Sequence, residues 1–404
     1  MERLMSFFGI FIMMGLAWLL SENKKKMDFR VIFGGLALQF ILALIIMKTS
    51  AGQMFFVWAK DVVTAVIEMS DTGAEFLFGA SYKDHFFAFK VLPTIIFASS
   101  LSYTLFYLGI LQKVVEAMAW VMKKVMNISG AESLVTAANV FIGQTEAPLF
   151  VKPYLRTMTQ SEIMVMMTGG MATVAGGVLA AYVGFGVSAG HLLAASIMSA
   201  PAAIVLAKIL YPELEKSPTM GTVSIVPERE EVNVFEAACK GASEGLHLAL
   251  NVGAMLIAFI SLVKLVNIGL GELGGLFGVT LSLELIFGTL FRPIAFCMGI
   301  SWEESRIVGE MLGTKVVINE FLSFIQLGEY ISGDKVGQLS QRAITITTYA
   351  LCGFANFSSI AIQVGGIGAL EPYRKKDFAR HGLKAMIGGT LAAFMTACVA
   401  GVLL

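Results

Sequence analysis

Three polar residues, Gln144, Thr145 and Glu146, stand in an unbroken row within the otherwise apolar segment VFIGQTEAPLF. An amide, a hydroxyl and a carboxylate together can both donate hydrogen bonds to a polar molecule and accept them from it. A second carboxylate, Glu320, follows Asn319 in the segment KVVINEFLSF. Because a carboxylate in a membrane costs about 2.5 to 3.5 kcal/mol even on lenient insertion scales, each acid needs a partner or a ligand.

Two further segments combine polar side chains with glycines. GGMATVAGGVLAAYVGFG contains Thr173, and CGFANFSSIAIQVGGIG contains Asn356, Ser358 and Ser359. Glycines allow a helix to unwind, and unwound carbonyls joined by Thr173 and Asn139 form an oxygen-only ligand set that suits sodium. The amides, hydroxyls and two carboxylates suit an uncharged, hydroxyl-rich solute, since a carboxylate pairs well with a sugar diol. No cluster of lysine, arginine or histidine indicates an anionic substrate.

Structural roles remain open for each of these residues. A single buried acid can cap a helix, a hydroxyl can join two membrane helices by a hydrogen bond, and glycines can simply permit close packing. Two acids that lie 174 residues apart (320 − 146 = 174), each beside amides and near a Gly-rich segment, favour one shared binding site.

The composition is that of an integral membrane protein. Of the 404 residues, 56% are hydrophobic and only 14% charged, and the mean hydropathy is +0.77. Basic and acidic residues balance at 29 each, so no bulk charge indicates a nucleic-acid partner. The cysteines are far apart and the histidines lack a second ligand at metal spacing, so neither a disulfide framework nor a zinc or haem site is expected.

Apolar segments predict eight membrane spans, at about 4–20, 31–48, 86–112, 162–187, 191–210, 246–267, 343–369 and 382–403. The basic clusters lie between spans one and two, three and four, and seven and eight, and the charged linker 211–233 lies between five and six. All four connections fall on one face, which the positive-inside rule makes cytoplasmic. We therefore expect both termini outside, with residues 4–20 a membrane helix rather than a signal peptide, because its basic residues follow the apolar run.

Two remaining apolar regions, 130–156 and 280–335, are interrupted by polar residues and predict re-entrant hairpins, which membranes tolerate only within protein or around a water-filled cavity. The order of long span, hairpin, Gly-broken span and further span occurs twice. Each unit has three crossings, so the second is inverted relative to the first, as in secondary transporters. The expected division is scaffold helices 1–85 with an interfacial helix at 50–68, first repeat 86–210, linker 211–245 and second repeat 246–404.

The motifs GQTEAP, NEF, FANFSSIAI and GGMATVAGGVL, in this order along nearly the whole chain, closely resemble the concentrative nucleoside transporter family. The resemblance implies an all-α membrane protein with eight transmembrane helices and two re-entrant hairpins, an inverted-repeat, elevator-type transporter and not an enzyme. It further implies a homotrimer in the bacterial inner membrane that takes up nucleosides such as uridine with sodium or, in some members, protons.

The family pattern also implies roles for individual residues. The nucleobase side comprises Gln144, Thr145, Glu146, Val178 and Leu250; the ribose side comprises Glu320, Phe354, Asn356 and Ser359; the sodium ligands are Asn139, Ile142, Thr173 and Val174. Sodium is favoured as the coupling ion because Asn139 and Thr173 both retain oxygen-bearing side chains.

Three rival interpretations make different predictions. Proton coupling through Glu146 or Glu320 would give accumulation driven by a pH gradient without sodium. An intramembrane hydrolase would consume its substrate, although no Ser/His or metal set is present in the sequence to support one. A channel would neither saturate nor transport uphill.

Overall fold

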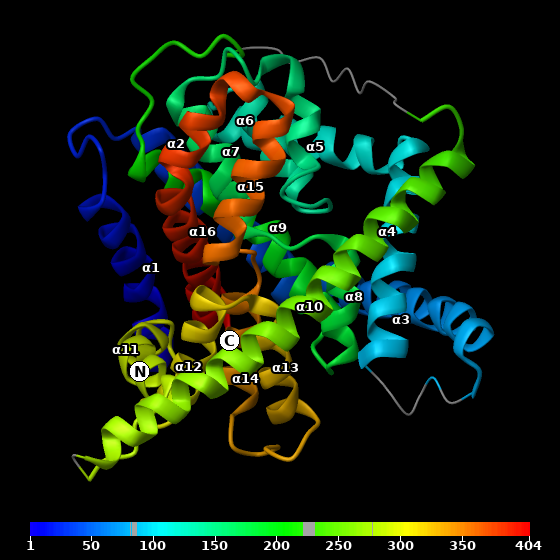
Figure 1. The fold of residues 1–404 in the computed structure, drawn as a ribbon. Coiled ribbons are helices and arrows are strands. Elements are labelled where there is room, and N and C mark those ends of the chain that lie inside the picture. The colour runs from blue at the N-terminus through cyan, green and yellow to red at the C-terminus, as the bar shows by residue number, and fades with distance from the viewer. Residues whose placement is uncertain (81, 83–86, 221–230, 277) are drawn as a thin grey trace.

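The structure, a computed structural model, describes residues 1–80, 82, 87–220, 231–276 and 278–404, and these form helices without a strand (Figure 1). Seven helical segments of this part are long and apolar enough to cross a membrane: α1 Glu2–Leu19, α2 Phe29–Lys48, Phe87–Tyr107 (η2 and α4), Gln160–Gly184 (α7 and α8), α9 Ala189–Leu210, α10 Val234–Gly275 and Pro372–Leu403 (η4 and α16). The remaining predicted span, 343–369, is the interrupted pair α14 Gln341–Leu351 and α15 Phe357–Leu370. The predicted all-α membrane fold is confirmed.

Both Gly-rich spans are broken where the sequence places the glycines. Helix α7 (Gln160–Ala172) ends at Thr173, which is extended, and α8 (Gly176–Gly184) begins after three non-helical residues. Helix α14 ends at Cys352, and Gly353 has a φ of 138°, which an L side chain rarely adopts. Each break leaves carbonyl groups at a helix C-terminus without a partner in the helix.

The two hairpins differ in their second arms. Hairpin 1 consists of α6 (Gly130–Asn139), a turn, and the 3-10 segment η3 (Ala147–Tyr154), in which Pro148 and Pro153 remove donors that an α-helix needs. Hairpin 2 consists of α12 (Ser305–Val317) and α13 (Glu320–Ile331), and Asn319 caps α13 by accepting a hydrogen bond from the Leu322 N–H at 2.9 Å.

Each hairpin is preceded by a separate helix that was not predicted as an element of its own, one mostly in the expected connection after span 86–112 and one within the expected hairpin 280–335. The predicted span 86–112 ends as a helix at Tyr107, where Gly109, with a φ of 77°, turns the chain into the amphipathic helix α5 (Ile110–Met126). The predicted hairpin 280–335 contains α11 (Leu283–Cys297), which is separated from hairpin 2 by Gly299 with a φ of 90°. Apolar content continues across both glycines, so hydropathy alone did not locate these turns.

The order of elements is repeated along the chain. In the first half it is α4 (Leu92–Tyr107), α5, hairpin 1, α7 with α8, and α9; in the second half it is α10, α11, hairpin 2, α14 with α15, and α16 (Lys375–Leu403). The predicted linker 211–245 falls partly on residues 221–230, which lie outside the described residues, and its last part is already helical because α10 begins at Val234.

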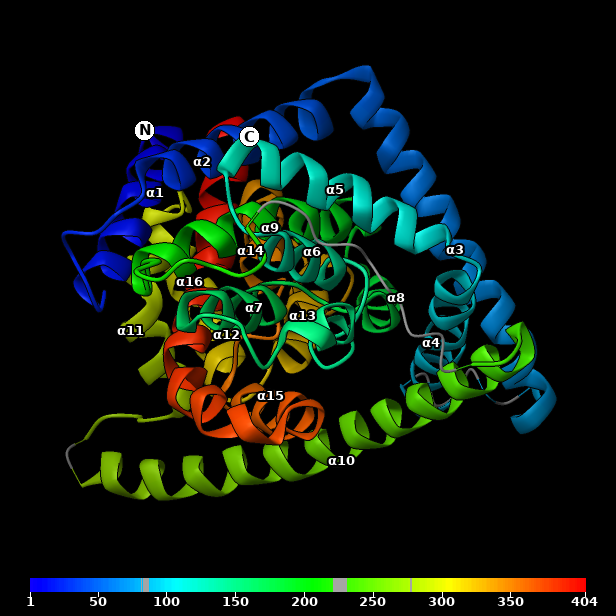
Figure 2. The same cartoon turned by 90° about the horizontal axis from the view of Figure 1, so that it is seen from above.

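Helices α4 and α10 cross along one side of the molecule, and Figure 2 shows α10 running past the helices of the centre. Their contact depends on glycines: a Cβ at Gly245 would lie 2.8 Å from the Ile96 Cα, and one at Gly241 would lie 2.8 Å from the Ser100 Cα. The Ser100 hydroxyl donates a hydrogen bond to the Ala238 carbonyl at 2.8 Å.

Helices α1 and α2 pack against the centre of the molecule instead. The Gln39 amide on α2 donates hydrogen bonds to the Met198 carbonyl on α9 and to the Thr396 hydroxyl on α16. The Arg3 guanidinium donates to the Leu404 carbonyl at 2.5 Å, so the N-terminal and C-terminal helices end side by side. Helix α3 (Ser50–Phe78), which extends ten residues beyond the predicted interfacial segment, contacts both α4 and α9.

Candidate functional site

The two helix breaks cross each other at the centre of the protein. The Phe354 N–H donates a hydrogen bond to the Thr173 carbonyl at 3.3 Å. A Cβ at Gly353 would lie 2.8 Å from the Met171 carbonyl oxygen, so only glycine allows this approach. The C-terminal ends of α7 and α14, each carrying the negative end of a helix dipole, are thereby brought together.

Glu320, at the start of α13, is held by two donors. Its carboxylate accepts hydrogen bonds from the Tyr182 hydroxyl at 3.1 Å and from the Asn356 amide at 3.0 Å, and its residue is only 5% exposed. Asn356 is the N-cap of α15, and its side-chain oxygen accepts from the Ser359 N–H at 2.9 Å and from the Ser358 hydroxyl at 2.6 Å. Asn356 therefore fixes the tip of hairpin 2 to the beginning of α15.

Gln144 joins the tip of hairpin 1 to the same helix. Its amide nitrogen donates to the Ser359 hydroxyl at 3.1 Å, and its oxygen accepts from the Gln363 amide at 3.0 Å. Gln363 also donates to the Met167 carbonyl on α7 at 3.0 Å. A continuous series of hydrogen bonds therefore connects the two hairpins by way of the first two turns of α15.

Glu146 and Thr145 lie beside this series. The Thr145 hydroxyl donates to the Glu146 carboxylate at 3.0 Å, and the carboxylate folds back over Gly143, where a Cβ would lie 2.0 Å from its Oε2. A Cβ at Gly366 would lie 2.6 Å from the Thr145 methyl group, which places this tip against α15 as well. The tip of hairpin 1 therefore contacts α15 through Thr145 as well as through Gln144.

Aromatic rings surround the Glu320 end of the series. The ring of Tyr182 stacks on Phe324 with centroids 4.2 Å apart, and Phe321 contacts Tyr182, Phe87 and Phe185 edge-on. Tyr182, Phe321 and Phe324 are themselves buried, so these rings enclose the Glu320 end of the series in an apolar environment.

The residues predicted to bind sodium gather where hairpin 1 meets the end of α7. Asn139 is 1% exposed; its amide nitrogen donates to the Val135 carbonyl, whereas its oxygen has no hydrogen-bond partner among the described residues. A Cβ placed on Gly170 would lie 3.4 Å from that oxygen, so the Asn139 side chain lies against the last turn of α7. The Ile142 and Val174 carbonyls likewise accept no hydrogen bond from the described residues. Oxygens without a hydrogen-bond partner, of which that of Asn139 is buried, are the type of ligand that a hard cation takes.

The remaining predicted residues differ in position. Val178 is buried on α8, Thr173 is buried at the end of α7, and Phe354 is half-buried at the crossing of the two breaks. Leu250 lies on α10 and is 60% exposed, so the chain does not enclose it with the others.

Sequence reasoning missed three buried polar residues near the site, Tyr182, Lys315 and Gln363. Tyr182 and Gln363 stand in the two Gly-rich segments already singled out, and each is a large polar side chain in an apolar helix. A large polar side chain that stands alone in an apolar segment could therefore have been recognised as a candidate site residue from the sequence. Their partners, Glu320 and Gln144, lie more than 100 residues away in the chain and could only be identified from the fold.

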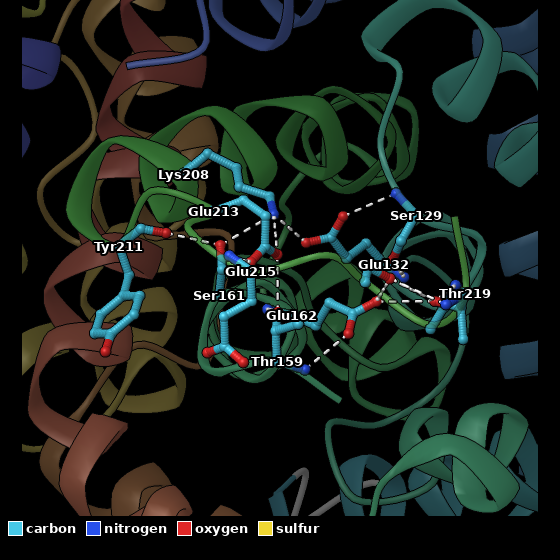
Figure 3. Close-up of polar contacts among 12 residues, drawn as sticks. Ser129, Glu132, Thr159, Ser161, Glu162, Lys208, Tyr211, Glu213, Glu215 and Thr219 are labelled. Atoms are coloured by element: carbon cyan, nitrogen blue, oxygen red, sulfur yellow. Dashed lines mark hydrogen bonds and ion pairs between the residues drawn. The ribbon is translucent and has the colours of Figure 1, made fainter. Parts of the chain in front are cut away.

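A second polar cluster lies at the base of hairpin 1 (Figure 3). Lys208, near the end of α9, forms an ion pair with Glu132 at 2.5 Å and a longer one with Glu213 at 3.3 Å. Glu162 accepts hydrogen bonds from the Ser217 and Thr219 hydroxyls in the segment that follows α9. The cluster fastens α6, α7, α9 and residues 213–219 to one another and lies away from the helix breaks.

Lys208→Met is expected to lower the free energy of unfolding by about 3 to 5 kcal/mol, because it leaves the Glu132 carboxylate buried without its cation. Denaturation of the purified protein in detergent, followed by circular dichroism, measures this change. Lys216→Met, at an exposed lysine of the same segment, serves as the control and is expected to change the free energy by less than about 0.5 kcal/mol. Equal stability of the two variants would show that the ion pair is not a stabilising contact.

Family models of known proteins match most of the chain. The model for the Na+ dependent nucleoside transporter C-terminus matches residues 191–401, the corresponding N-terminus model matches residues 8–81, and a model described as nucleoside recognition matches residues 88–189. The matches follow one another in order and cover both halves of the fold.

Individual proteins are similar over the whole chain. Solute carrier family 28 member 3 of Mus musculus is 43% identical over 100% of this chain, sodium/nucleoside cotransporter 1 of Rattus norvegicus is 41% identical over 100%, and an uncharacterized transporter of Haemophilus influenzae is 44% identical over 99%. The chain spans 59% and 64% of the two mammalian proteins and 98% of the bacterial one.

Solved structures agree with these similarities. CNTnw in an inward-facing substrate-bound state is 39% identical, with a TM-score of 0.94, and the match covers 100% of this chain and 98% of that one. A variant of CNTnw in an outward-facing state matches with a TM-score of 0.93 and the same coverage. The chain described here therefore belongs to the concentrative nucleoside transporter family, whose members are membrane transporters and not enzymes.

Proposed function

We propose that this protein is a sodium-coupled symporter that concentrates nucleosides by an elevator-type movement. The observation that carries the proposal is the hydrogen-bonded series from Glu320 through Asn356, Ser359 and Gln144 to Gln363, which joins the two hairpins. The family match and the names of the similar cotransporters support the coupling and the substrate class.

In this proposal the two ends of the series bind different parts of one nucleoside. Glu320, Asn356 and Ser359 bind the ribose hydroxyls, because a carboxylate held by two donors can accept from a diol. Gln144, Thr145, Glu146 and Val178 face the base, and Phe354 lines the pocket on the ribose side. Leu250 reaches the base only if α10 and the central helices move relative to each other, as an elevator movement requires.

Sodium, transported together with the nucleoside, binds between hairpin 1 and the end of α7. The Asn139 oxygen, the Thr173 hydroxyl and the Ile142 and Val174 carbonyls supply its ligands. Since Asn139 and Ile142 shortly precede Gln144, and Asn139 lies beside Gly170, the ion orders the hairpin tip and so raises affinity for the nucleoside.

The contacts favour a revised division into moving and stationary parts. Spans one and two were assigned to the scaffold from the sequence, but α1 and α2 pack against α16 and α9, next to the broken helices. The proposal therefore retains α4 and α10 as the stationary frame and lets α1 and α2 move with the hairpins. A homotrimer in a bacterial inner membrane, with both termini outside, completes the proposal.

Coupling to one sodium ion provides a useful driving force. One charge that moves down about 100 mV releases about 2.3 kcal/mol, and a tenfold concentration ratio corresponds to about 1.4 kcal/mol. Voltage alone could therefore sustain roughly a 40-fold nucleoside gradient.

Uptake of radiolabelled uridine into proteoliposomes tests the function. We expect uptake against a gradient that saturates, requires an inward sodium gradient, and is competed by other nucleosides but not by free bases. Accumulation driven by a pH gradient without sodium would instead establish the proton-coupled alternative. Uptake that neither saturates nor runs uphill would identify a channel.

A further inference from the structure

Helix α5 (Ile110–Met126), which leads from α4 to hairpin 1, buries only one of its faces. The buried residues recur at helical spacing and are Val115, Ala119, Met122 and Met126. The helix packs against α2 and α6, and Figure 1 shows it beside α6. A Cβ at Gly35 of α2 would lie 2.8 Å from the terminal methyl group of Met126, so the buried face is in close contact with α2.

The exposed face of α5 is divided lengthwise into an apolar flank and a basic flank. Because successive residues of an α-helix are about 100° apart, the apolar flank consists of Ile110, Val114, Val121 and Val125, and the basic flank of Lys113, Trp120 and Lys124. A helix with an apolar strip beside a basic strip lies along the membrane surface, with its lysines towards the lipid headgroups.

An open hollow lies at the C-terminal end of this basic flank. Its volume is about 600 Å³, and it is lined by Trp120, Lys123, Lys124, Asn127, Ile128 and Met220. None of these residues is acidic, and within the described part of the chain neither lysine forms an ion pair with a carboxylate. The hollow therefore contains two positive charges that the described residues do not neutralise.

Trp120 provides a further free donor at this hollow. The Lys124 ammonium group lies 4.8 Å from the centre of the Trp120 ring, and the similar pair of Lys24 and Trp18 is 5.3 Å apart. The Trp18 indole N–H donates to the Lys24 carbonyl at 3.2 Å, whereas that of Trp120 donates to no described residue. Trp120 is also 61% exposed, so its N–H is available to a ligand.

These groups fit one kind of occupant. Two ammonium groups and an indole N–H are donors for the oxygens of a phosphate. The apolar flank of α5 adjoins the hollow through Val121 and Val125, which suits hydrocarbon chains and has no use for a soluble phosphate. A membrane surface that carries negative lipids attracts lysines of an amphipathic helix in the same way.

We propose that the hollow at the end of α5 is a binding site for an anionic phospholipid of the inner leaflet. The phosphate lies between Lys123 and Lys124 and accepts from Trp120, and the acyl chains follow the apolar flank. The assignment to the inner leaflet rests on the expected orientation, with both termini outside, whereas the site itself requires no particular substrate or coupling ion. Since α6 begins at Gly130, the lipid binds where α5 leads into hairpin 1.

Quenching of tryptophan fluorescence by brominated lipids tests the proposal in reconstituted vesicles. Trp18→Phe, Trp58→Phe and Trp302→Phe together leave Trp120 as the only one of the four tryptophans. At Trp120 we expect brominated phosphatidylglycerol to be preferred over brominated phosphatidylcholine by at least about fivefold, because each lysine at an anionic membrane surface contributes roughly a factor of five. Equal quenching by the two lipids would overturn the proposal.

Charge variants distinguish a site from a generally basic surface. Lys123→Gln combined with Lys124→Gln should lower the lipid preference to less than about twofold, and the corresponding pair of arginine substitutions should retain it. Lys113→Gln, at an exposed lysine of the same flank that does not line the hollow, is the matched control and should leave the preference unchanged. An equal loss in Lys113→Gln would show a diffuse attraction and no site.

Inorganic phosphate separates a lipid site from a site for a soluble anion. An excess of phosphate in the buffer should leave the preference for phosphatidylglycerol at Trp120 unchanged, because phosphate lacks the acyl chains that contact the apolar flank. Loss of the preference under these conditions would assign the hollow to a soluble phosphate and overturn the proposal. Size-exclusion chromatography of each variant in detergent verifies that the protein is folded.

Discussion

Glu320→Gln is expected to weaken uridine binding at least about 100-fold, which corresponds to about 2.7 kcal/mol, while the protein remains folded. The carboxylate now accepts hydrogen bonds from Tyr182 and from Asn356. Glutamine has only one acceptor oxygen, so its amide group must face one of these donors, and the negative charge that a ribose diol would use is lost. Hydrogen bonds to a charged group contribute about 1.5 to 3 kcal/mol each, so the loss of the charge that would accept from the ribose hydroxyls accounts for the expected change.

Isothermal titration with uridine at saturating sodium measures this change, and size-exclusion chromatography in detergent verifies the fold. Glu329→Gln is the matched control, because Glu329 lies on the same helix, α13, but is exposed. It should bind uridine as the wild-type protein does. Near-normal binding by Glu320→Gln would remove Glu320 from the substrate site and leave it a role in joining hairpin 2 to α8 and α15.

The parts of the fold that could be predicted are those with a local cause. Glycines and polar residues within apolar segments located both helix breaks and both hairpin tips, because backbone that leaves a helix in a membrane needs small residues and polar partners. The extra helices α5 and α11 were not predicted, since the turns that separate them depend on the positive φ of Gly109 and Gly299 within continuing apolar sequence.

The site was predictable as a set of segments but not as a set of contacts. Gln144, Glu320, Asn356 and Ser359 were identified from their polarity, and the structure connects all four. Tyr182 and Gln363 entered only with the fold, because their significance lies in partners from other helices. Lys315 was not identified for the same reason, because its hydrogen-bond partner, the Ala350 carbonyl, lies on α14.

Asn139→Ala is expected to shift the sodium concentration for half-maximal uridine binding upward by more than about tenfold. Its side-chain oxygen is buried, unpartnered and adjacent to the end of α7, whereas its nitrogen already donates to Val135. Alanine removes the unpartnered oxygen, which is the ligand available to a cation, and retains a good helix former at the end of α6. The neighbouring Gln144 should then position the base only when sodium is abundant.

The matched control is Thr136→Ala, one turn earlier on α6, because its hydroxyl is also buried and without a partner among the described residues. If sodium bound generally to unpartnered oxygens of this helix, both substitutions would weaken its binding. If sodium binds at the helix end, only Asn139→Ala should weaken its binding, because Asn139 alone adjoins both Gly170 and the hairpin turn. Titration of sodium at fixed uridine separates these cases, and an equal sodium response in Asn139→Ala and wild-type protein would place the coupling ion elsewhere.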